Sequence, residues 1–326
     1  MAKGRGPRAE AFERIGGLYD VRVLEPSPPT VWDEPFLADD PVAGGEVVPL
    51  ERPGAQSWDG LCRADGEAAL ADWAADRWLG AWRRLSPLPA SFVPSRQSLH
   101  ALAEHAIAPA RHSACGKIGL RYTRAGFGTP YFGEDRQVRV ERGELVSEGP
   151  NGAVRREPLS TLRQAALLAD VPAGAITGVY VPTTPGDLDN KLVVEEEAAA
   201  ALGDWFGFCT SVLEQVRDEA SDASRVQIWP EHFDMAVDLG DENAGQRANY
   251  GGSPGDADHP EPYLYVGPWA KASGPFWNES FGASLAYGQL LAADDQRQAA
   301  LTFLRAGRDL LAGGAGAAGP AGAAGG

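Results

Sequence analysis

The sequence predicts an α+β protein in which antiparallel β-sheet packs with amphipathic helices in a single main domain. Three observations predict this class. Apolar residues recur at the helical spacing i, i+3, i+4 and i+7 over 195–216. Short strand-like segments separated by Gly-containing turns fill 117–159, and a second group of strand-like segments fills 226–269. At 326 residues, the chain is long enough to bury a large core without disulfide or metal support.

Residues 1–94 are predicted to be a loop-rich N-terminal extension with one helix. Prolines at positions 26, 28, 29, 35, 41 and 53 interrupt any long periodic pattern there. The helix is expected over 69–85, where apolar residues fall on one stripe, and the proline-containing stretch 86–94 forms the boundary.

The main domain is expected to span 95–312. It begins with a helix that starts near 95–98 and stops before Pro109. The elements expected next are strands at 117–122, 137–142, 144–147 and 154–159, a short helix at 161–168 and a strand at 176–181.

The strongest helical pattern covers 195–216 and carries Cys209 on its apolar stripe, which favours a buried structural thiol over a reactive one. Glu195 begins a run of three glutamates in the first turn, where negative charge suits the helix dipole. A last helix is expected over 295–311. The Gly/Ala-rich tail 313–326 has nothing to bury and is predicted to be disordered.

The net charge of −16 argues against a nucleic-acid or anionic-membrane partner. Most of it lies in 164–262, which holds four basic and nineteen acidic residues. This stretch is either a solvated surface or a carboxylate-rich site for a divalent cation or a cationic ligand. No apolar run is long enough to span a bilayer, no signal sequence is recognisable, and the three cysteines form no C-x-x-C pair, so we expect a cytoplasmic protein.

Two segments match known sequence motifs but lack the secondary structure that these motifs require. The G-x-G-x-x-G pattern at 314–319 lies in the tail and follows a helix, so no nucleotide cofactor is expected. The G-x-S-x-G pattern at 251–255 is followed by turn residues instead of the helix that a nucleophile elbow needs. His100, His105 and His112 are better explained as surface residues than as metal ligands.

The segment 226–239 gives the clearest indication of a functional site in the chain. Beyond Pro230 its residues alternate, so that a strand would place Trp229, Phe233 and the apolar residues after them on one face. The other face would carry His232, Asp234, Ala236 and Asp238. Aspartate is disfavoured in strands, and its presence beside a histidine needs a partner, a metal or a ligand.

A meander of this strand with strands at 247–251 and 262–269 would bring His259 and Glu261 towards its edge. His232, Asp234, His259 and Glu261 are then candidate ligands for a divalent metal, with His232 and Asp234 as candidate catalytic residues. The same residues could instead form a structural polar network. Aromatic and polar residues nearby could line a pocket for a small organic ligand, and we select Trp229, Ser253, Asp256 and Tyr263.

Four short segments, Trp229–Asp234, Gly251–Asp256, Pro260–Tyr263 and Phe276–Glu279, resemble a bacterial family catalogued only as a domain of unknown function. Members are similar in a W-P-x-H-F-D strand and an S-P-G-D turn. The likeness runs from about 95 to 311 and implies one continuous domain, but it implies no reaction.

Two functional hypotheses follow from the sequence. The first is a small-molecule or metal-binding protein that uses the strands and turns of 226–269. The second is a metal-assisted hydrolase or other small-molecule enzyme with His232 and Asp234 at its centre. Whether the chain is an enzyme stays open at this point, as do the cofactor and the oligomeric state.

Overall fold

The computed structural model describes residues 84–314, except 124–125, 131, 133–135, 142, 150–152 and 221. It also describes two short strands, β1 (Val21–Val23) and β2 (Gly45–Val47), which pair antiparallel. The helix predicted over 69–85 lies almost entirely outside the described residues, as does the predicted tail from 315 onwards.

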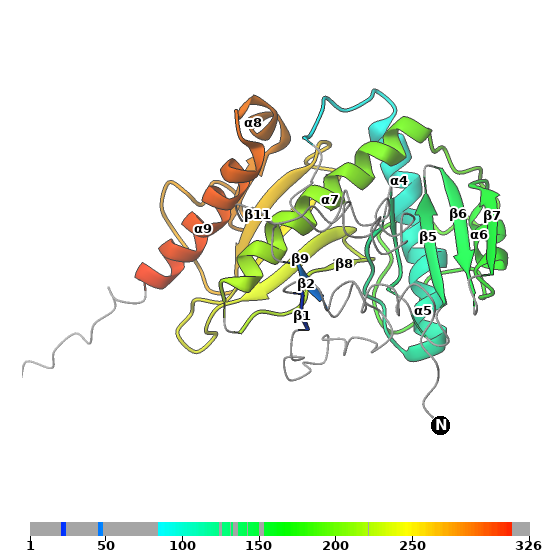
Figure 1. The fold of residues 1–326 in the computed structure, drawn as a ribbon, viewed down its shortest axis with the longest axis horizontal. Coiled ribbons are helices and arrows are strands. Elements are labelled where there is room, and N and C mark those ends of the chain that lie inside the picture. The colour runs from blue at the N-terminus through cyan, green and yellow to red at the C-terminus, as the bar shows by residue number, and fades with distance from the viewer. Residues whose placement is uncertain are drawn as a thin grey trace, which may run out of the picture.

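The described residues form two five-stranded antiparallel sheets (Figure 1), which confirms the predicted α+β class. The first sheet contains, in spatial order, β3 (Arg121–Thr123), β4 (Gly126–Gly128), β5 (Gln137–Glu141), β6 (Glu144–Glu148) and β7 (Val154–Pro158). The second contains β8 (Gln227–Trp229), β9 (Asp234–Leu239), β10 (Ala248–Ser253), β11 (Tyr263–Pro268) and β12 (Ala283–Ala286). Each is a meander, and a bridge between Leu120 and Ile228 connects their edges.

Helices pack around these sheets. They are α4 (Phe92–Leu102), a π-helical turn (Ala103–Ile107), α5 (Ala108–Cys115), α6 (Leu162–Leu168), α7 (Glu196–Asp218), α8 (Tyr287–Ala292) and α9 (Gln296–Gly314). None of the helices in the described part of the chain is long and apolar enough to cross a membrane.

The long helix α7 is the centre of the core because its apolar stripe meets both sheets. It contacts β3 and β4 of the first sheet and β9 and β10 of the second. Figure 1 shows α7 running past β9 towards α4. Trp205, Phe206 and Cys209 on this stripe are fully buried, and the predicted burial of Cys209 is thereby confirmed. Gly252 of β10 lies directly against Cys209 and leaves no room for a side chain of its own.

Helix α9 covers the same face of the second sheet as α7. Gly307 of α9 packs directly on Val266 of β11. Arg305 and Arg308 of α9 both form ion pairs with Glu219, just after the end of α7. The two helices therefore cover one face of the second sheet, and the residues on its other face are available to form a site.

The first helix does not stop at Pro109, as predicted, but continues through the π-helical turn to Cys115. The Ala108 N–H bonds to the Ala103 carbonyl, five residues back, so the Glu104 carbonyl is freed and accepts from the Tyr180 hydroxyl at 2.7 Å. Proline has no N–H for the His105 carbonyl, which accepts from the Gly174 N–H instead. Distant residues thus satisfy the carbonyls that a proline and a π-turn leave open.

Other elements differ from the predictions. The strand expected at 176–181 is a turn segment, while β4, β12 and α8 were not predicted. The first helix, expected to start near 95–98, begins at Phe92, and α9 extends to Gly314, into the predicted tail.

Candidate binding groove

The segment 226–239 is a tight hairpin instead of one continuous strand. β8 ends at Trp229, residues 230–233 form a turn, and β9 begins at Asp234, with Trp229 paired to Asp234. Phe233 takes a left-handed φ of 55° and donates its N–H to the Trp229 carbonyl at 2.7 Å, which closes the turn. The face predicted for Trp229 was therefore wrong, and His232, which was predicted on a strand, lies in the turn. Trp229 lies on the Asp234 face because the chain reverses, and His232 is exposed in the turn.

The face of the second sheet opposite α7 and α9 holds a groove of about 890 Å³, a volume within the range of small-molecule sites. We define the groove by its lining residues, which come from β8, β9, β10 and β11 and from the segments next to these strands. They are Ser224, Trp229, Glu231, His232, Asp234, Ala236, Asp238, Glu242, Arg247, Asn249, Ser253, Asp256, Tyr263, Tyr265, Gly267, Pro268, Trp269 and Phe281.

Asp234 lines the groove with an incompletely paired carboxylate. The residue is 9% exposed. Its Oδ2 accepts a hydrogen bond from the Tyr265 hydroxyl, whereas its Oδ1 is buried and has no partner among the residues that the structure describes. Burial raises the pKa of Asp234, although the Tyr265 bond and the nearby His232 act in the opposite direction. A buried, unpaired carboxylate oxygen is costly in the free protein, which is why it points to a ligand.

The contact between Asp234 and Tyr265 depends on Gly251. β10 lies between β9 and β11, and Gly251 is paired with Ala236 on one side and Tyr265 on the other. A Cβ atom at Gly251 would overlap the far end of the Tyr265 ring. The glycine therefore lets the phenol lie across β10 and reach Asp234.

The groove is acidic. Its described lining contains five carboxylates, from Glu231, Asp234, Asp238, Glu242 and Asp256, and a single guanidinium, from Arg247. Arg247 is already engaged by ion pairs to Asp238 and to Asp222, and it stacks over the Trp269 ring at 5.3 Å. The field in the groove thus favours a positively charged ligand.

Glu231 supplies a second unpaired acceptor. Its Oε2 is buried without a hydrogen-bond partner among the described residues. Burial raises the pKa of Glu231, and so do the carboxylates of Asp234 and Glu104, whereas a hydrogen bond from its own backbone N–H and the nearby His232 lower it. At one end of the groove, the interacting carboxylates of Asp234 and Glu231 therefore each have one oxygen that receives no hydrogen bond from the described residues.

Aromatic rings form a wall of the groove. The rings of Tyr263, Tyr265 and Phe281 contact one another, with centroids 6.1 to 6.4 Å apart, and the His259 ring is 4.9 Å from that of Tyr263. Such a wall offers an apolar surface and electron-rich ring faces to a ligand.

The predicted ligand-binding residues Trp229, Ser253, Asp256 and Tyr263 all line the groove. Two of them also build the turn after β10. The Ser253 hydroxyl accepts from the Gly255 N–H, and Asp256 accepts from the backbone N–H groups of Asp258 and His259. Asp256 Oδ2 accepts from the Tyr263 hydroxyl at 2.7 Å. Although burial alone would raise the pKa of Asp256, these hydrogen bonds hold it below its ordinary value.

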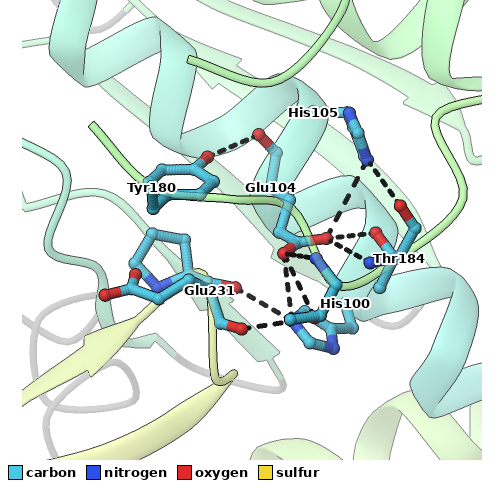
Figure 2. Close-up of polar contacts among 8 residues, drawn as sticks. His100, Glu104, His105, Tyr180, Thr184 and Glu231 are labelled. Carbon is cyan, nitrogen blue, oxygen red and sulfur yellow. Dashed lines mark hydrogen bonds and ion pairs between the residues drawn. The ribbon is translucent and has the colours of Figure 1, made fainter. Parts of the chain in front are cut away.

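A buried network behind the groove holds the 230–233 turn in place (Figure 2). Glu104 is fully buried, and its carboxylate accepts from the backbone N–H groups of Thr183 and Thr184 at 2.8 and 2.9 Å and from both threonine hydroxyls. The Thr183 hydroxyl also lies 3.2 Å from the Glu231 carbonyl.

The π-helical turn at Glu104 thus connects the first helix to the site. His100 contributes to the same connection. Its Nε2 donates to the Pro230 carbonyl at 2.9 Å, and its ring stacks on Phe233. His105 is buried and His100 is half-buried, so the prediction that these two are surface residues was wrong. The helical pattern did not reveal this burial, because it depends on the distant segments 180–184 and 230–233 that cover the helix.

The structure does not bring the four predicted metal ligands into one cluster. His232 and Asp234 line the groove, but His259 contacts Asp256 and Glu279, with its Nε2 3.3 Å from Glu279 Oε1, and Glu261 is exposed. In the part of the chain that the structure describes, no group of three or more His, Cys, Asp or Glu side chains is arranged to hold a metal ion.

Sequence reasoning missed Tyr265, Glu231 and Gly251 as site residues. The alternation of Tyr263, Tyr265 and Gly267 places them on one face of β11, which was a usable signal. The sequence alone does not contain the register that sets Tyr265 opposite Gly251.

Comparison of the chain with protein-family models, with curated proteins and with solved structures returned no match.

Proposed function

We propose that this protein binds a small organic molecule in the groove. The observation that carries the proposal is the unpaired Oδ1 of Asp234, which is buried in a groove large enough for such a ligand. A ligand that donates a hydrogen bond to this oxygen would remove the penalty of leaving it unpaired. The aromatic wall of Tyr263, Tyr265 and Phe281 would provide the apolar contact area.

A small-molecule screen by thermal shift, paired with native mass spectrometry of the purified full chain, tests the proposal. A ligand that binds only the folded state raises the melting temperature, and the rise grows with the logarithm of the ratio of ligand concentration to Kd. The decisive variant is Gly267→Leu, because Gly267 lines the groove and a Cβ there would have no atom nearer than 3.7 Å. The Cβ atom fits at this position, and the rest of the leucine side chain should occupy part of the groove and abolish the shifts.

Gly288→Leu is the matched control. Gly288 is exposed in α8, and a Cβ at this position meets nothing within 4 Å. It should leave the ligand-induced shifts unchanged. Hits that survive Gly267→Leu, or the absence of any hit and any co-purified molecule, would contradict the proposal.

Catalysis by His232 and Asp234 is the second candidate function. It is favoured by one observation, namely that both residues line the same groove and that His232 is close enough to lower the pKa of Asp234. Mass spectrometry of each hit after incubation with the protein separates the two functions. Turnover that is lost in His232→Ala, while binding is kept, would support an enzyme. Elemental analysis of the purified chain tests the metal-assisted form, which requires stoichiometric metal.

A further inference from the structure

We infer that the groove selects a protonated primary amine, whose ammonium group donates hydrogen bonds to Asp234 and Glu231. The inference rests on the proposed function and specifies its ligand class. It starts from two buried carboxylate oxygens, Asp234 Oδ1 and Glu231 Oε2, that lack partners among the described residues. The two residues line the same groove and interact electrostatically.

Both oxygens are acceptors when the carboxyl groups are ionised, so the missing group is a donor. A primary ammonium has three N–H donors and a full positive charge on one small atom, which allows it to bridge two acceptors. It remains protonated at neutral pH, since an unperturbed alkyl ammonium has a pKa of about 10. Hydrogen bonds between ionised partners are also roughly twice as strong as neutral ones.

The arrangement around Asp234 argues against a guanidinium ligand. A guanidinium binds a carboxylate best through two parallel hydrogen bonds, one to each oxygen. Tyr265 already occupies Oδ2, so Asp234 offers a ligand only one free oxygen. This single acceptor suits the point-like ammonium group.

The surroundings favour a cation that carries an apolar body. Five carboxylates face the groove, and its described guanidinium, that of Arg247, is neutralised by Asp238 and Asp222. The rings of Tyr263 and Phe281 provide π faces and apolar area beside the acidic end. A metal ion is a poorer occupant, because no three potential ligands converge in the described residues.

Fluorine NMR with three matched probes tests the inference. The probes are para-fluorophenethylamine, the alcohol of the same shape, and the N,N,N-trimethyl derivative of the amine. The alcohol removes the charge, and the trimethyl derivative keeps the charge but removes every N–H donor. We expect the amine to bind the full chain at least about tenfold more tightly than either, as the loss of a charged hydrogen bond predicts.

Asp234→Asn and Glu231→Gln should each weaken binding of the amine by about tenfold or more and leave binding of the alcohol nearly unchanged. Asp294→Asn is the charge-matched control, because Asp294 is exposed and lies outside the groove. Unfolding curves of all three variants show whether a loss of binding reflects a loss of fold.

Equal binding of amine and alcohol, or of amine and trimethyl derivative, would overturn the inference. So would the absence of binding by the amine at millimolar concentration. These results would leave the proposed function standing if the wider screen finds another ligand that Gly267→Leu excludes. If that screen also fails, the proposed function fails with the inference.

Discussion

Tyr265 lies across Gly251, and its hydroxyl reaches Asp234 on the far side of β10. The absence of a side chain at one position thus sets the geometry of an acidic group two strands from the tyrosine. Substitution of Gly251 can therefore test whether the contact between Tyr265 and Asp234 depends on the missing side chain.

Gly251→Ala should displace the Tyr265 ring and break its hydrogen bond to Asp234. Because the overlap involves the free end of a side chain, we expect a moderate decrease in the free energy of unfolding, by about 1–2 kcal/mol. Urea unfolding measures it. In a Tyr265→Ala background the same substitution should cost nothing, since the overlap is gone. Gly288→Ala, at an open helical position, should stabilise the protein slightly.

Asp234→Asn should raise the stability of the ligand-free protein at neutral pH. Burial raises the pKa of Asp234, so the folded chain binds this proton more tightly than the unfolded chain. The ionised carboxylate therefore opposes folding above its folded-state pKa, and the penalty disappears below the unfolded-state value of about 4. The gain from the substitution should shrink as the pH falls towards that value, as urea unfolding over a pH series would show.

If Asp234→Asn instead lowered the free energy of unfolding at neutral pH, this prediction would be contradicted. It would mean that the carboxylate stabilises the hairpin as part of a structural polar network, the alternative that the sequence left open. Asp294→Asn should have little effect on the free energy of unfolding, because the Asp294 side chain is exposed.

Periodicity was sufficient to predict the elements whose own residues decide their structure. The apolar stripe of α7 and the alternation along β9 were both visible, and β9 does place Asp234, Ala236 and Asp238 together in the groove. Local patterns failed where distant groups intervene. Pro109 stays within a continuous helix because Gly174 and Tyr180 bind the open carbonyls.

The site was only partly predictable for the same reason. Trp229 was assigned to the wrong face because alternation was counted through a turn that Phe233 closes with a positive φ. Tyr265 could not be paired with Asp234 before the register of β9, β10 and β11 was known. The residue types in the sequence were enough to locate the acidic and aromatic region. The contacts between these residues became known only from the three-dimensional structure.

Glu104→Gln should destabilise the fold and loosen the segment that the carboxylate holds. A glutamine retains one acceptor oxygen but brings an N–H₂ group towards the donors of Thr183 or Thr184. We expect a loss of about 2 kcal/mol in the free energy of unfolding, the scale of one charged hydrogen bond. Hydrogen exchange should become faster at the Thr183 and Thr184 amides.

The matched control is Glu157→Gln on the exposed strand β7, which should change stability by less than about 0.5 kcal/mol. If Glu104→Gln behaved like this control, the buried network would not be what fixes the 183–184 segment and, through it, the turn before Asp234.

Glu219→Gln should weaken the attachment of α9 to α7 in a pH-dependent way. Burial alone would raise the pKa of Glu219, but the hydrogen bonds from Arg305 and Arg308 outweigh it and hold the pKa below its ordinary value. A lowered pKa stabilises the fold above the unfolded-state value of about 4.3, and this contribution is lost as the pH falls through the folded-state value. The substitution should therefore cost about 1 kcal/mol at neutral pH and nothing in strong acid.

Asp189→Asn provides the comparison for this ion pair, because Asp189 also pairs with an arginine, Arg163, but its side chain is 70% exposed to solvent. It should leave the unfolding midpoint unchanged at every pH, since solvent screens an exposed pair. Added salt should reduce the effect of Glu219→Gln only partly, because the Glu219 side chain is 24% exposed and receives two arginines. A cost that persisted undiminished in strong acid would show that Glu219 acts through packing and not through its charge.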